Sequence, residues 1–570
     1  MQNNINLFVY IIEPHMFETS LHSHFKNEIC WVFFQLNRKE PEFCFDELST
    51  RLRDCLLSIK KRIDSDPSNE YSIYLHVLYK CIGFIRDNRN GLGEHHITYV
   101  FIYAFYNTFP TLAIKSIREM ITPPTTDHQP YYLGCWKDLK QLCHYVYNKT
   151  YNRDHEIIIE CVNIMNAQLL QDWETWKFST HCFSKLHISN VSKFIPRENS
   201  KYGWLFDILA NHWTRTHKPY IFKFINNPLS SKRATLKSKM IYRKLVSYLN
   251  KSLHTTEIFL CNRNICDLNM DSVSCHTANQ HKNVFLQLHN NDLDIIFKEH
   301  IQQNKHHKIP RENEYFTHGT SFSKLSIYTI IQYAMQSYEN TEQPFSLNHS
   351  LFIEANWCKS YRQQISRLNK LHIIPLIDVS YDMKQNSLYN AIGLGILLSY
   401  MSLYKNRLIA VDRQSSWIAF DANATIIDIV STFMDSIFNM RNTTANFENA
   451  ILIILEGLKS QKKSPAIRDI NIVILSNFNN STINESTIES LFAQQGFSYF
   501  PKIVYWNVNE SRYVDVPCSH NSTHSFCVSG YSTCHLHSFQ QMGSTYEYIV
   551  NILSQKRFAR FDNYIKQLLN

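Results

Sequence analysis

Apolar residues recur at intervals of three and four positions through much of the first 360 residues, with short polar stretches between these segments. This spacing puts apolar side chains on one face of a helix, so it predicts a mostly helical region. No strand-like alternation persists there, and antiparallel helix pairs stacked on one another are the expected architecture. The predicted helices cover residues 52–63, 74–85, 97–109, 139–147, 154–170 and 205–212.

The pattern changes after residue 369, where apolar runs of strand length alternate with segments at helical spacing. Such alternation predicts a parallel, doubly wound sheet, and residues 545–570 are expected to form a closing helix. The predicted strands are 373–377, 408–411, 472–475 and 503–505, and the predicted helices are 387–404, 425–438, 447–458 and 486–495. Because 570 residues exceed what one core supports, we predict a helical-repeat domain over residues 1–366 and an α/β domain over residues 367–570.

Composition narrows the class of protein. Hydrophobic residues make up 44% of the chain, which indicates a folded protein. The sequence contains no run of about 18 apolar residues, so no membrane helix is predicted. The amino-terminal stretch lacks the basic region of a signal peptide. The 15 cysteines show no regular spacing of the kind that indicates a disulfide framework, which favours reduced thiols in a cytoplasmic protein. We expect no membrane partner. Abundant Asn, Ile, Lys and Tyr suggest an AT-rich source, such as a large DNA virus or a protist; a viral protein would lie in the host cytoplasm.

The stretch from residue 371 to 400 combines an apolar strand, an acidic loop and a helix. Ligands of open parallel sheets bind at the carboxyl ends of the strands, where this loop is expected. The loop reads Asp378-Val379-Ser380-Tyr381-Asp382 and offers three side chains that carry oxygen. Oxygen ligands of this kind suit a hard divalent cation.

A second feature is a basic segment, residues 208–256, which contains no Asp or Glu. Aromatic residues are interleaved with its basic residues, as suits a phosphate backbone with stacked, unpaired bases. The alternative interpretation is a solvated helix face that acidic neighbours elsewhere in the chain balance. The candidate nucleic-acid-binding residues are Arg215, Lys218, Lys232, Arg233, Lys237, Lys239, Arg243 and Lys244.

Charged residues also gather in three stretches, 85–94, 134–139 and 191–206. These stretches either line a polar groove or form helix caps and salt bridges between helices, and the residues by themselves favour the second interpretation. Gly91-Leu92-Gly93 is not a phosphate-binding loop, because no strand is predicted before it.

The same stretches resemble the family named domain of unknown function 2828. The resemblance continues through residues 242–245, Trp357, the loop at 378–382, Trp417, Trp506-Asn507 and residues 529–532. That family is related to Ro-type RNA-binding proteins, which join a helical-repeat TROVE module to a von Willebrand factor A-like domain. The resemblance implies a HEAT-like helical-repeat domain that binds RNA, and a doubly wound, Rossmann-like A-type domain that provides a surface for a protein partner.

The resemblance also implies a metal-ion-dependent adhesion site, which draws on Asp-x-Ser-x-Ser, a Thr and an Asp. Here Asp382 replaces the second Ser, Thr444 stands beside Ala445 at the Thr position, and Asn477 replaces the Asp. Asp382 either compensates for Asn477 in binding Mg²⁺ or caps the following helix. The candidate metal ligands are therefore Asp378, Ser380, Asp382, Thr444 and Asn477, with a vestigial site as the alternative.

No catalytic constellation stands out in the sequence. Cys518, His520, His524 and Cys527 have ligand-like spacing but lack the paired-cysteine knuckle of a zinc site. We therefore expect a non-enzymatic RNA-binding or ribonucleoprotein component. The alternative is a protein-interaction scaffold with a degenerate metal site and no RNA binding, and a weaker one is a hydrolase that uses an unrecognised carboxylate pair.

Overall fold

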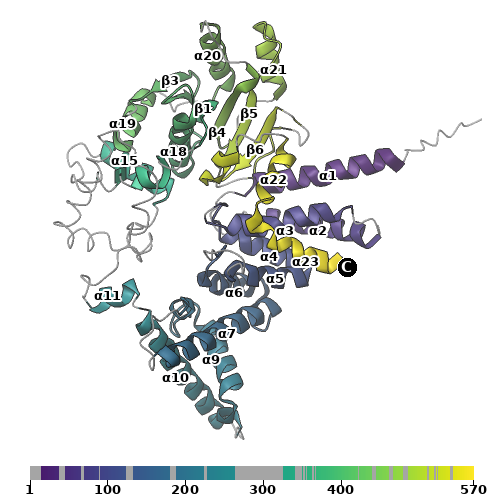
Figure 1. The fold of residues 1–570 in the computed structure, drawn as a ribbon, viewed down its shortest axis with the longest axis vertical. Coiled ribbons are helices and arrows are strands. Elements are labelled where there is room, and N and C mark those ends of the chain that lie inside the picture. Colours follow the sequence, from purple (N-terminus) through teal and green to yellow (C-terminus); the bar gives the residue numbers. More distant parts are fainter. Residues whose placement is uncertain are drawn as a thin grey trace, which may run out of the picture. The chain divides into compact units, whose positions relative to one another are not determined.

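The computed structural model divides the chain into two compact units (Figure 1). Unit 1 comprises Met1–Ile85, Arg89–Ile97 and Ile365–Asn570, and unit 2 comprises Arg86–Asn88 and Thr98–Gln364. The structure describes residues 14–36, 45–65, 70–88, 90–122, 132–179, 188–223, 228–253, 255–262, 325–339, 350, 353–354, 356–362, 365, 368–421, 423–438, 444–460, 467–478, 485–509, 513–518, 522, 524–538 and 544–569.

These units differ from the division expected from chain order. The predicted boundary at residue 366 lies one residue after Ile365, where the chain returns to unit 1. The first helices of the chain, however, group with the sheet rather than with the other helices. Helical periodicity shows that a segment forms a helix, but not which apolar face it packs against.

Unit 2 is helical in its described residues. Its elements are α4 (His96–Tyr106, from Thr98 on), α5 (Pro110–Ile121), α6 (Trp136–Thr150), α7 (Glu156–Ser179), α8 (Val191–Phe194), α9 (Gly203–His217), η1 (Pro219–Phe222), α10 (Pro228–Ser252), α11 (Thr256–Asn262), α15 (Ile327–Glu339) and η3 (Cys358–Arg362). Pairs of consecutive helices pack together, α6 with α7 and α9 with α10. The helices predicted between residues 97 and 212 are thereby confirmed.

Helix α10 illustrates how the pattern of apolar positions builds this unit. Its buried residues form one face, because they follow one another at spacings of three and four: Ala234, Ser238, Tyr242, Leu245 and Leu249. The face packs against α7 and α9 (Figure 1). Two hydrogen bonds fix the packing, from Ser238 Oγ to Ala210 O at 2.8 Å and from Tyr242 OH to Asn166 Oδ1 at 2.9 Å.

Unit 1 contains the sheet, whose six strands are β1 (His372–Asp378), β2 (Arg407–Val411), β3 (Ser416–Ala419), β4 (Ile470–Ser476), β5 (Lys502–Asn507) and β6 (Ser525–Ser529). The strand order is β3-β2-β1-β4-β5-β6. All neighbouring strands are parallel except β2 and β3, which are antiparallel. The four predicted strands are confirmed, whereas β3 and β6, with four and five residues, were missed because runs that short leave little periodicity to recognise.

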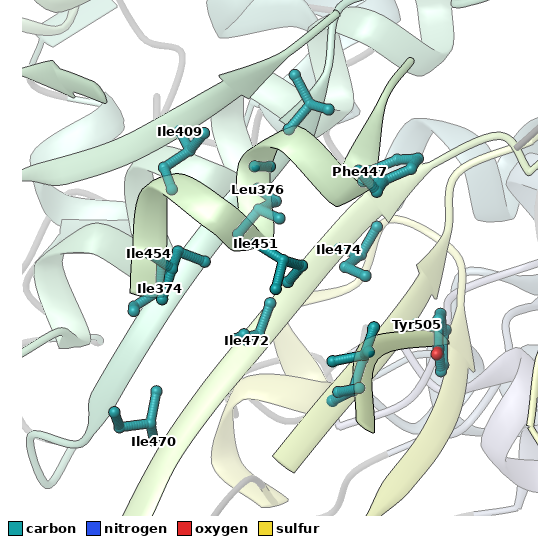
Figure 2. Packing of buried hydrophobic residues seen from close by; sticks show 14 of the residues in the cluster. Ile374, Leu376, Ile409, Phe447, Ile451, Ile454, Ile470, Ile472, Ile474 and Tyr505 are labelled. Atoms are coloured by element: carbon teal, nitrogen blue, oxygen red, sulfur yellow. The ribbon is translucent and has the colours of Figure 1, made fainter. Parts of the chain in front are cut away.

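Helices cover both faces of the sheet. Ile374 and Leu376 belong to a hydrophobic cluster with Ile451 and Ile454 of α20 (Phe447–Ser460), as Figure 2 shows. Residues of α21 (Glu485–Gln494) join the same cluster. Ile377 points to the opposite face, because successive strand residues alternate. There it meets α18 (Gln385–Met401) so closely that a Cβ on Gly395 would lie 2.4 Å from Ile377 Cδ1.

The remaining α-helices of unit 1 come from both ends of the chain, except α19, which lies between β3 and β4. They are α1 (Pro14–Phe34), α2 (Phe45–Ser65), α3 (Ser72–Arg86, to Ile85), α19 (Ile426–Ile437), α22 (Thr545–Leu553) and α23 (Arg560–Leu569). Helix α1 packs against α22 and β6, and Ser529 Oγ of β6 donates to Phe33 O of α1 at 2.9 Å. Among the helices of the described ranges, none has both the length and the apolar content required to cross a bilayer.

Candidate functional site

The carboxyl ends of β1 and β4 bring together a carboxylate and two hydroxyls, which we call the sheet-edge cluster: Asp378, Ser380 and Ser476. Asp378 Oδ1 accepts hydrogen bonds from Ser380 N at 3.0 Å and from Ser380 Oγ at 2.6 Å. Asp378 Oδ2 accepts from Ser476 Oγ at 2.6 Å. All three residues are at most 2% exposed. The predicted metal ligands Asp378 and Ser380 therefore lie together, and Ser476 is a member that sequence reasoning missed.

The Asp378 carboxylate is almost fully buried. Within the described ranges it forms no ion pair with a basic side chain. Burial raises the pKa of Asp378, the hydrogen bonds from Ser380 and Ser476 lower it, and the nearby charge of Asp382 raises it. A cation bound at this position would relieve the cost of burying the charged carboxylate.

The other predicted metal ligands have different surroundings. Asn477 Nδ2 donates to the backbone oxygen of Asp382 at 2.7 Å, so this side chain holds the β1 loop against the end of β4. The backbone oxygen of Asn477 in turn accepts from Asn509 Nδ2 at 3.0 Å. Thr444 is exposed and makes no hydrogen bond within the part of the chain that the structure describes. Asn477 thus positions the loop, and Thr444 does not join the cluster.

The donor set fits Mg²⁺ in part. Mg²⁺ binds through one or two protein carboxylates and completes its coordination with water, and the cluster offers Asp378 with two hydroxyls and a second carboxylate, Asp382, close enough to affect its pKa. The described residues contain no group of three or more His, Cys, Asp or Glu that could hold a metal ion. Any cation bound here would therefore depend on hydroxyl and water ligands.

The basic segment provides the second candidate site, on α10 in unit 2. Four of its predicted phosphate ligands are exposed and form no ion pair within the described residues: Lys232, Arg233, Lys237 and Lys244. They lie on the side of α10 away from its buried face. We call this surface the α10 basic face.

Two other predicted ligands are neutralised by acids from outside the basic segment. Lys239 Nζ lies 2.6 Å from Asp207 Oδ1 and 3.4 Å from Glu198 Oε1, and the hydrogen bond to Asp207 raises the pKa of Lys239. The Arg243 guanidinium donates to the Glu198 carboxylate. The alternative interpretation, a face balanced by acidic neighbours, thus describes these two positions.

The last two predicted ligands lie at the end of α9. The Arg215 guanidinium lies over the Phe222 ring, with its carbon 4.6 Å from the ring centroid. Lys218 follows the last residue of α9 and is half-buried. The structure therefore separates the eight predicted residues into a basic face, a neutralised pair and a helix end.

An aromatic cluster lies beside the carboxyl-terminal part of α10. Trp173 and Trp176 of α7 stack with ring centroids 4.9 Å apart, and the Tyr248 ring lies 5.7 Å from that of Trp176. Tyr248 is 49% exposed and follows Lys244 by one helical turn. Lys177 Nζ lies 5.1 Å from the Trp173 ring. The spacing of the two tryptophans along one helix face is the sequence signal that could have revealed this cluster.

A family model for DUF7788, a domain of unknown function, matches residues 372–559. This DUF7788 segment contains all six strands and the sheet-edge cluster, whereas the α10 basic face lies outside it. The resemblance to the domain of unknown function 2828 family was therefore wrong, because the match is to DUF7788. The chain is also similar to uncharacterized protein L728 of Acanthamoeba polyphaga mimivirus, with 22% identity over 515 residues, 85% of this chain and 78% of the relative.

Within the DUF7788 segment, two of the four residues with zinc-like spacing come together. Cys518 Sγ and Cys527 Sγ lie 3.0 Å apart, which is shorter than the separation of about 3.8 Å that a tetrahedral zinc with Zn–S bonds of about 2.3 Å imposes. His524 is exposed, and its ring packs on Phe500 at 4.8 Å. His520 lies outside the described residues. The thiol geometry does not fit zinc.

Arg86 and Asp138, from the charged stretches at residues 85–94 and 134–139, meet inside unit 2. Arg86 Nε donates to Asp138 Oδ2 at 2.8 Å, and both side chains are at most 1% exposed. Tyr99 OH donates to Asp138 Oδ1 at 2.9 Å. Cys135 N donates to Asp138 Oδ2 at 2.7 Å as part of the cap of α6. These contacts are the helix cap and salt bridge that the sequence favoured over a polar groove.

Proposed function

We propose that this protein is a non-enzymatic RNA-binding component and that unit 2 binds RNA through the α10 basic face. The observation that supports this proposal is the presence of four exposed cations on the side of α10 away from its buried residues, without acidic partners in the described residues. Basic side chains that pair with acids contribute little to binding a polyanion, because the acids already neutralise them. Lys239 and Arg243 are therefore removed from the proposed ligand set.

The length of the α10 basic face suits a nucleic-acid strand. Lys232 and Lys244 are twelve positions apart on α10, which corresponds to about 18 Å at a rise of about 1.5 Å per residue. A strand lying along this face would place several phosphates near the cations and release the counterions bound to those phosphates. The resulting affinity depends strongly on salt and little on base sequence.

The aromatic cluster favours a single strand over a duplex. The half-exposed Tyr248 ring extends the stacked pair of tryptophans and lies next to Lys244 on α10. An unpaired base stacks on such a ring while its phosphate contacts a neighbouring cation, whereas the bases of a duplex are already stacked on one another. We therefore propose single-stranded RNA as the ligand.

The proposal is tested with a triple variant, Lys232→Gln, Lys237→Gln and Lys244→Gln. Each removed phosphate contact on a single strand lowers the slope of log affinity against log salt by about 0.7, so the slope should fall in magnitude by about 2. The affinity for single-stranded RNA is measured by fluorescence anisotropy across a range of salt concentrations. Binding should weaken by a similar factor for RNAs of different sequence.

A matched control removes the same net charge from unit 1. The control residues are exposed, and they form no ion pair within the described ranges: Lys61, Lys370 and Lys556. Their combined change to Gln should leave the affinity and the salt slope close to those of the unchanged protein. Equal losses in both triple variants, or no loss in the α10 variant, would reject the assignment to α10.

We also propose a specific fold type for each of the two units. The strand order β3-β2-β1-β4-β5-β6, with antiparallel β3, supports a doubly wound, von Willebrand factor A-type domain. The packed helix pairs of unit 2 support a HEAT-like arrangement.

We further propose that the sheet-edge cluster binds Mg²⁺ weakly, and that the protein is cytoplasmic. The free cysteines among the described residues support a reducing compartment, and the similarity to a viral protein supports the host cytoplasm as that compartment.

A second candidate function is a protein-interaction scaffold that binds no RNA. The incomplete ligand set at the sheet edge favours it, because Thr444 is apart from the cluster and Asn477 serves as a loop anchor. In this case the sheet edge would contact a protein partner without a working metal site. Absence of RNA binding by the unchanged protein at low salt would favour this candidate over the first.

A further inference from the structure

Two thiols in unit 1 lie close enough to react with each other. Cys518 Sγ is 3.0 Å from Cys527 Sγ, and a disulfide needs the sulfurs to approach by only about 1 Å more. Cys527 belongs to β6, and Cys518 comes just before this strand in the chain. The backbone near Cys518 is held in place, because Gln35 Nε2 donates to Val514 O at 2.7 Å. Both thiols therefore occupy defined positions on the folded unit.

The two thiols differ in environment. Cys518 is 9% exposed, whereas Cys527 is fully buried. Thr545 Oγ1 lies 3.5 Å from Cys518 Sγ and accepts from Cys527 N at 3.2 Å. The hydrogen bond from the Cys527 thiol lowers the pKa of Cys518 and outweighs burial, which raises it. Burial raises the pKa of Cys527. Cys518 is therefore the thiol that more readily becomes a thiolate and meets a small oxidant.

We propose that Cys518 and Cys527 form a redox site, in which a peroxide oxidises Cys518 and Cys527 then closes a reversible disulfide. In the first step, the Cys518 thiolate attacks one peroxide oxygen, an S–O bond forms, the O–O bond breaks, and hydroxide leaves and takes up a proton. In the second step, the Cys527 sulfur attacks Cys518, the S–S bond forms, and the S–O bond breaks. The leaving hydroxide combines with the Cys527 proton, so two thiols and one hydrogen peroxide yield one disulfide and two waters.

Unit 2 contains a second thiol pair that serves as a matched control. Cys143 and Cys161 are hydrogen-bonded to each other, on α6 and α7. Both residues are fully buried. The hydrogen bond to Cys143 and burial both raise the pKa of Cys161. Because both sulfurs are fully buried, a peroxide in solution does not reach this pair in the folded protein. The proposal requires oxidation of the first pair under conditions that leave the second pair reduced.

The experiment treats the reduced full-length protein with hydrogen peroxide, then denatures it, alkylates the free thiols and digests it with trypsin. No Lys or Arg lies between residues 513 and 555, so one peptide, 513–556, contains Cys518, Cys527 and Cys534. The oxidised peptide should bear one alkyl group, on Cys534, and a mass loss of about 2 Da relative to the free dithiol. Fragment ions should place the link between Cys518 and Cys527, and dithiothreitol should restore three alkyl groups.

Controls separate a specific site from general oxidation. Cys261 is exposed and reports that the peroxide reached the protein. Cys143 and Cys161 should remain fully alkylated, and Cys143→Ser should leave the 513–556 disulfide unchanged. Cys518→Ser should prevent its formation, and mapping of the unchanged protein provides the same test should this variant fail to fold. The proposal is overturned by a 513–556 peptide that keeps three alkyl groups when Cys261 is oxidised, by a link to Cys30 or Cys534, or by a product that dithiothreitol does not reduce.

Discussion

Asp138→Asn is the substitution whose effect on stability follows most directly from the structure. Asp138 is fully buried and accepts hydrogen bonds from Arg86 Nε, Tyr99 OH and Cys135 N, at 2.8, 2.9 and 2.7 Å. Asparagine keeps the shape of the side chain but removes its charge. It also turns one acceptor oxygen into an NH₂ group that faces donors. The substitution therefore leaves the Arg86 guanidinium buried without a counter-charge.

The magnitude follows from this burial. Removing one partner of a buried ion pair costs about 3–5 kcal/mol, because the remaining charge stays desolvated. Burial lowers the pKa of Arg86, but the charge of Asp138 raises it overall, so the pair is favourable only while both members are present. We therefore expect Asp138→Asn to lower the free energy of unfolding of unit 2 by about 3–5 kcal/mol.

Urea unfolding, followed by tryptophan fluorescence and circular dichroism, measures this loss as a lower midpoint at an unchanged slope. Glu28→Gln is the matched control, because Arg51 donates to Glu28 at 2.7 and 2.9 Å but is 38% exposed. A pair this exposed should contribute about 1 kcal/mol or less. The double variant Arg86→Met with Asp138→Leu removes both charges and should be far less destabilised than Asp138→Asn.

Three results would refute this reasoning. A loss below about 1 kcal/mol in Asp138→Asn would show that the Arg86 charge does not need Asp138. A double variant as unstable as Asp138→Asn would show that packing, rather than the uncompensated charge, accounts for the loss. Equal costs for Asp138→Asn and Glu28→Gln would show that burial does not distinguish the two ion pairs.

Two further predictions concern unit 1. His535 is fully buried between Tyr548 OH and Ser529 O, and burial lowers its pKa to about 4. The contribution of neutral His535 to stability is therefore fully present above about pH 6.5 and is lost as the pH falls toward 4. The free energy of unfolding should fall by about 2 kcal/mol between pH 7 and 5 because of this residue. A His535→Gln variant that loses the same free energy over this interval would contradict the assignment. At the sheet edge, Mg²⁺ at about ten times its Kd should stabilise the unchanged protein by about 1.4 kcal/mol in a thermal melt. Asp378→Asn should abolish that gain, and the absence of any gain in the unchanged protein would retire the metal site.

The apolar pattern predicted many of the helices and strands, but it did not single out α1 or α10, which have 21 and 25 residues. The pattern at residues 373–377 and 472–475 predicted β1 and β4, because buried parallel strands are continuous apolar runs. The same reasoning missed β3, whose four residues pair with β2 in an antiparallel ladder. It also did not foresee that α1 packs against β6, because periodicity identifies an apolar face without identifying its neighbour.

In the candidate sites, too, residues close together in the sequence were predicted and residues far apart were missed. The loop after β1 was predicted with Asp378 and Ser380 together, because they are two residues apart and next to a strand. Ser476 is 98 positions from Asp378, and no local pattern connects them. On α10, Glu198 and Asp207 neutralise two predicted phosphate ligands although the basic segment itself contains no acid. Ion pairs depend on the distance between charged groups in the folded protein, and the sequence alone does not specify that distance for residues far apart in the chain.

The sequence by itself determined the local features of this protein: the mostly helical character of its first 360 residues, four of its six strands, the acidic loop at 378–382 and the basic character of residues 208–256. These features depend on residues a few positions apart, whose spacing along the chain sets their spacing in space. Only the tertiary structure decided which cations of α10 have no acidic partner among the described residues, which hydroxyls surround Asp378, and that Cys518 and Cys527 lie 3.0 Å apart. Each of these depends on segments that folding brings together from distant parts of the chain.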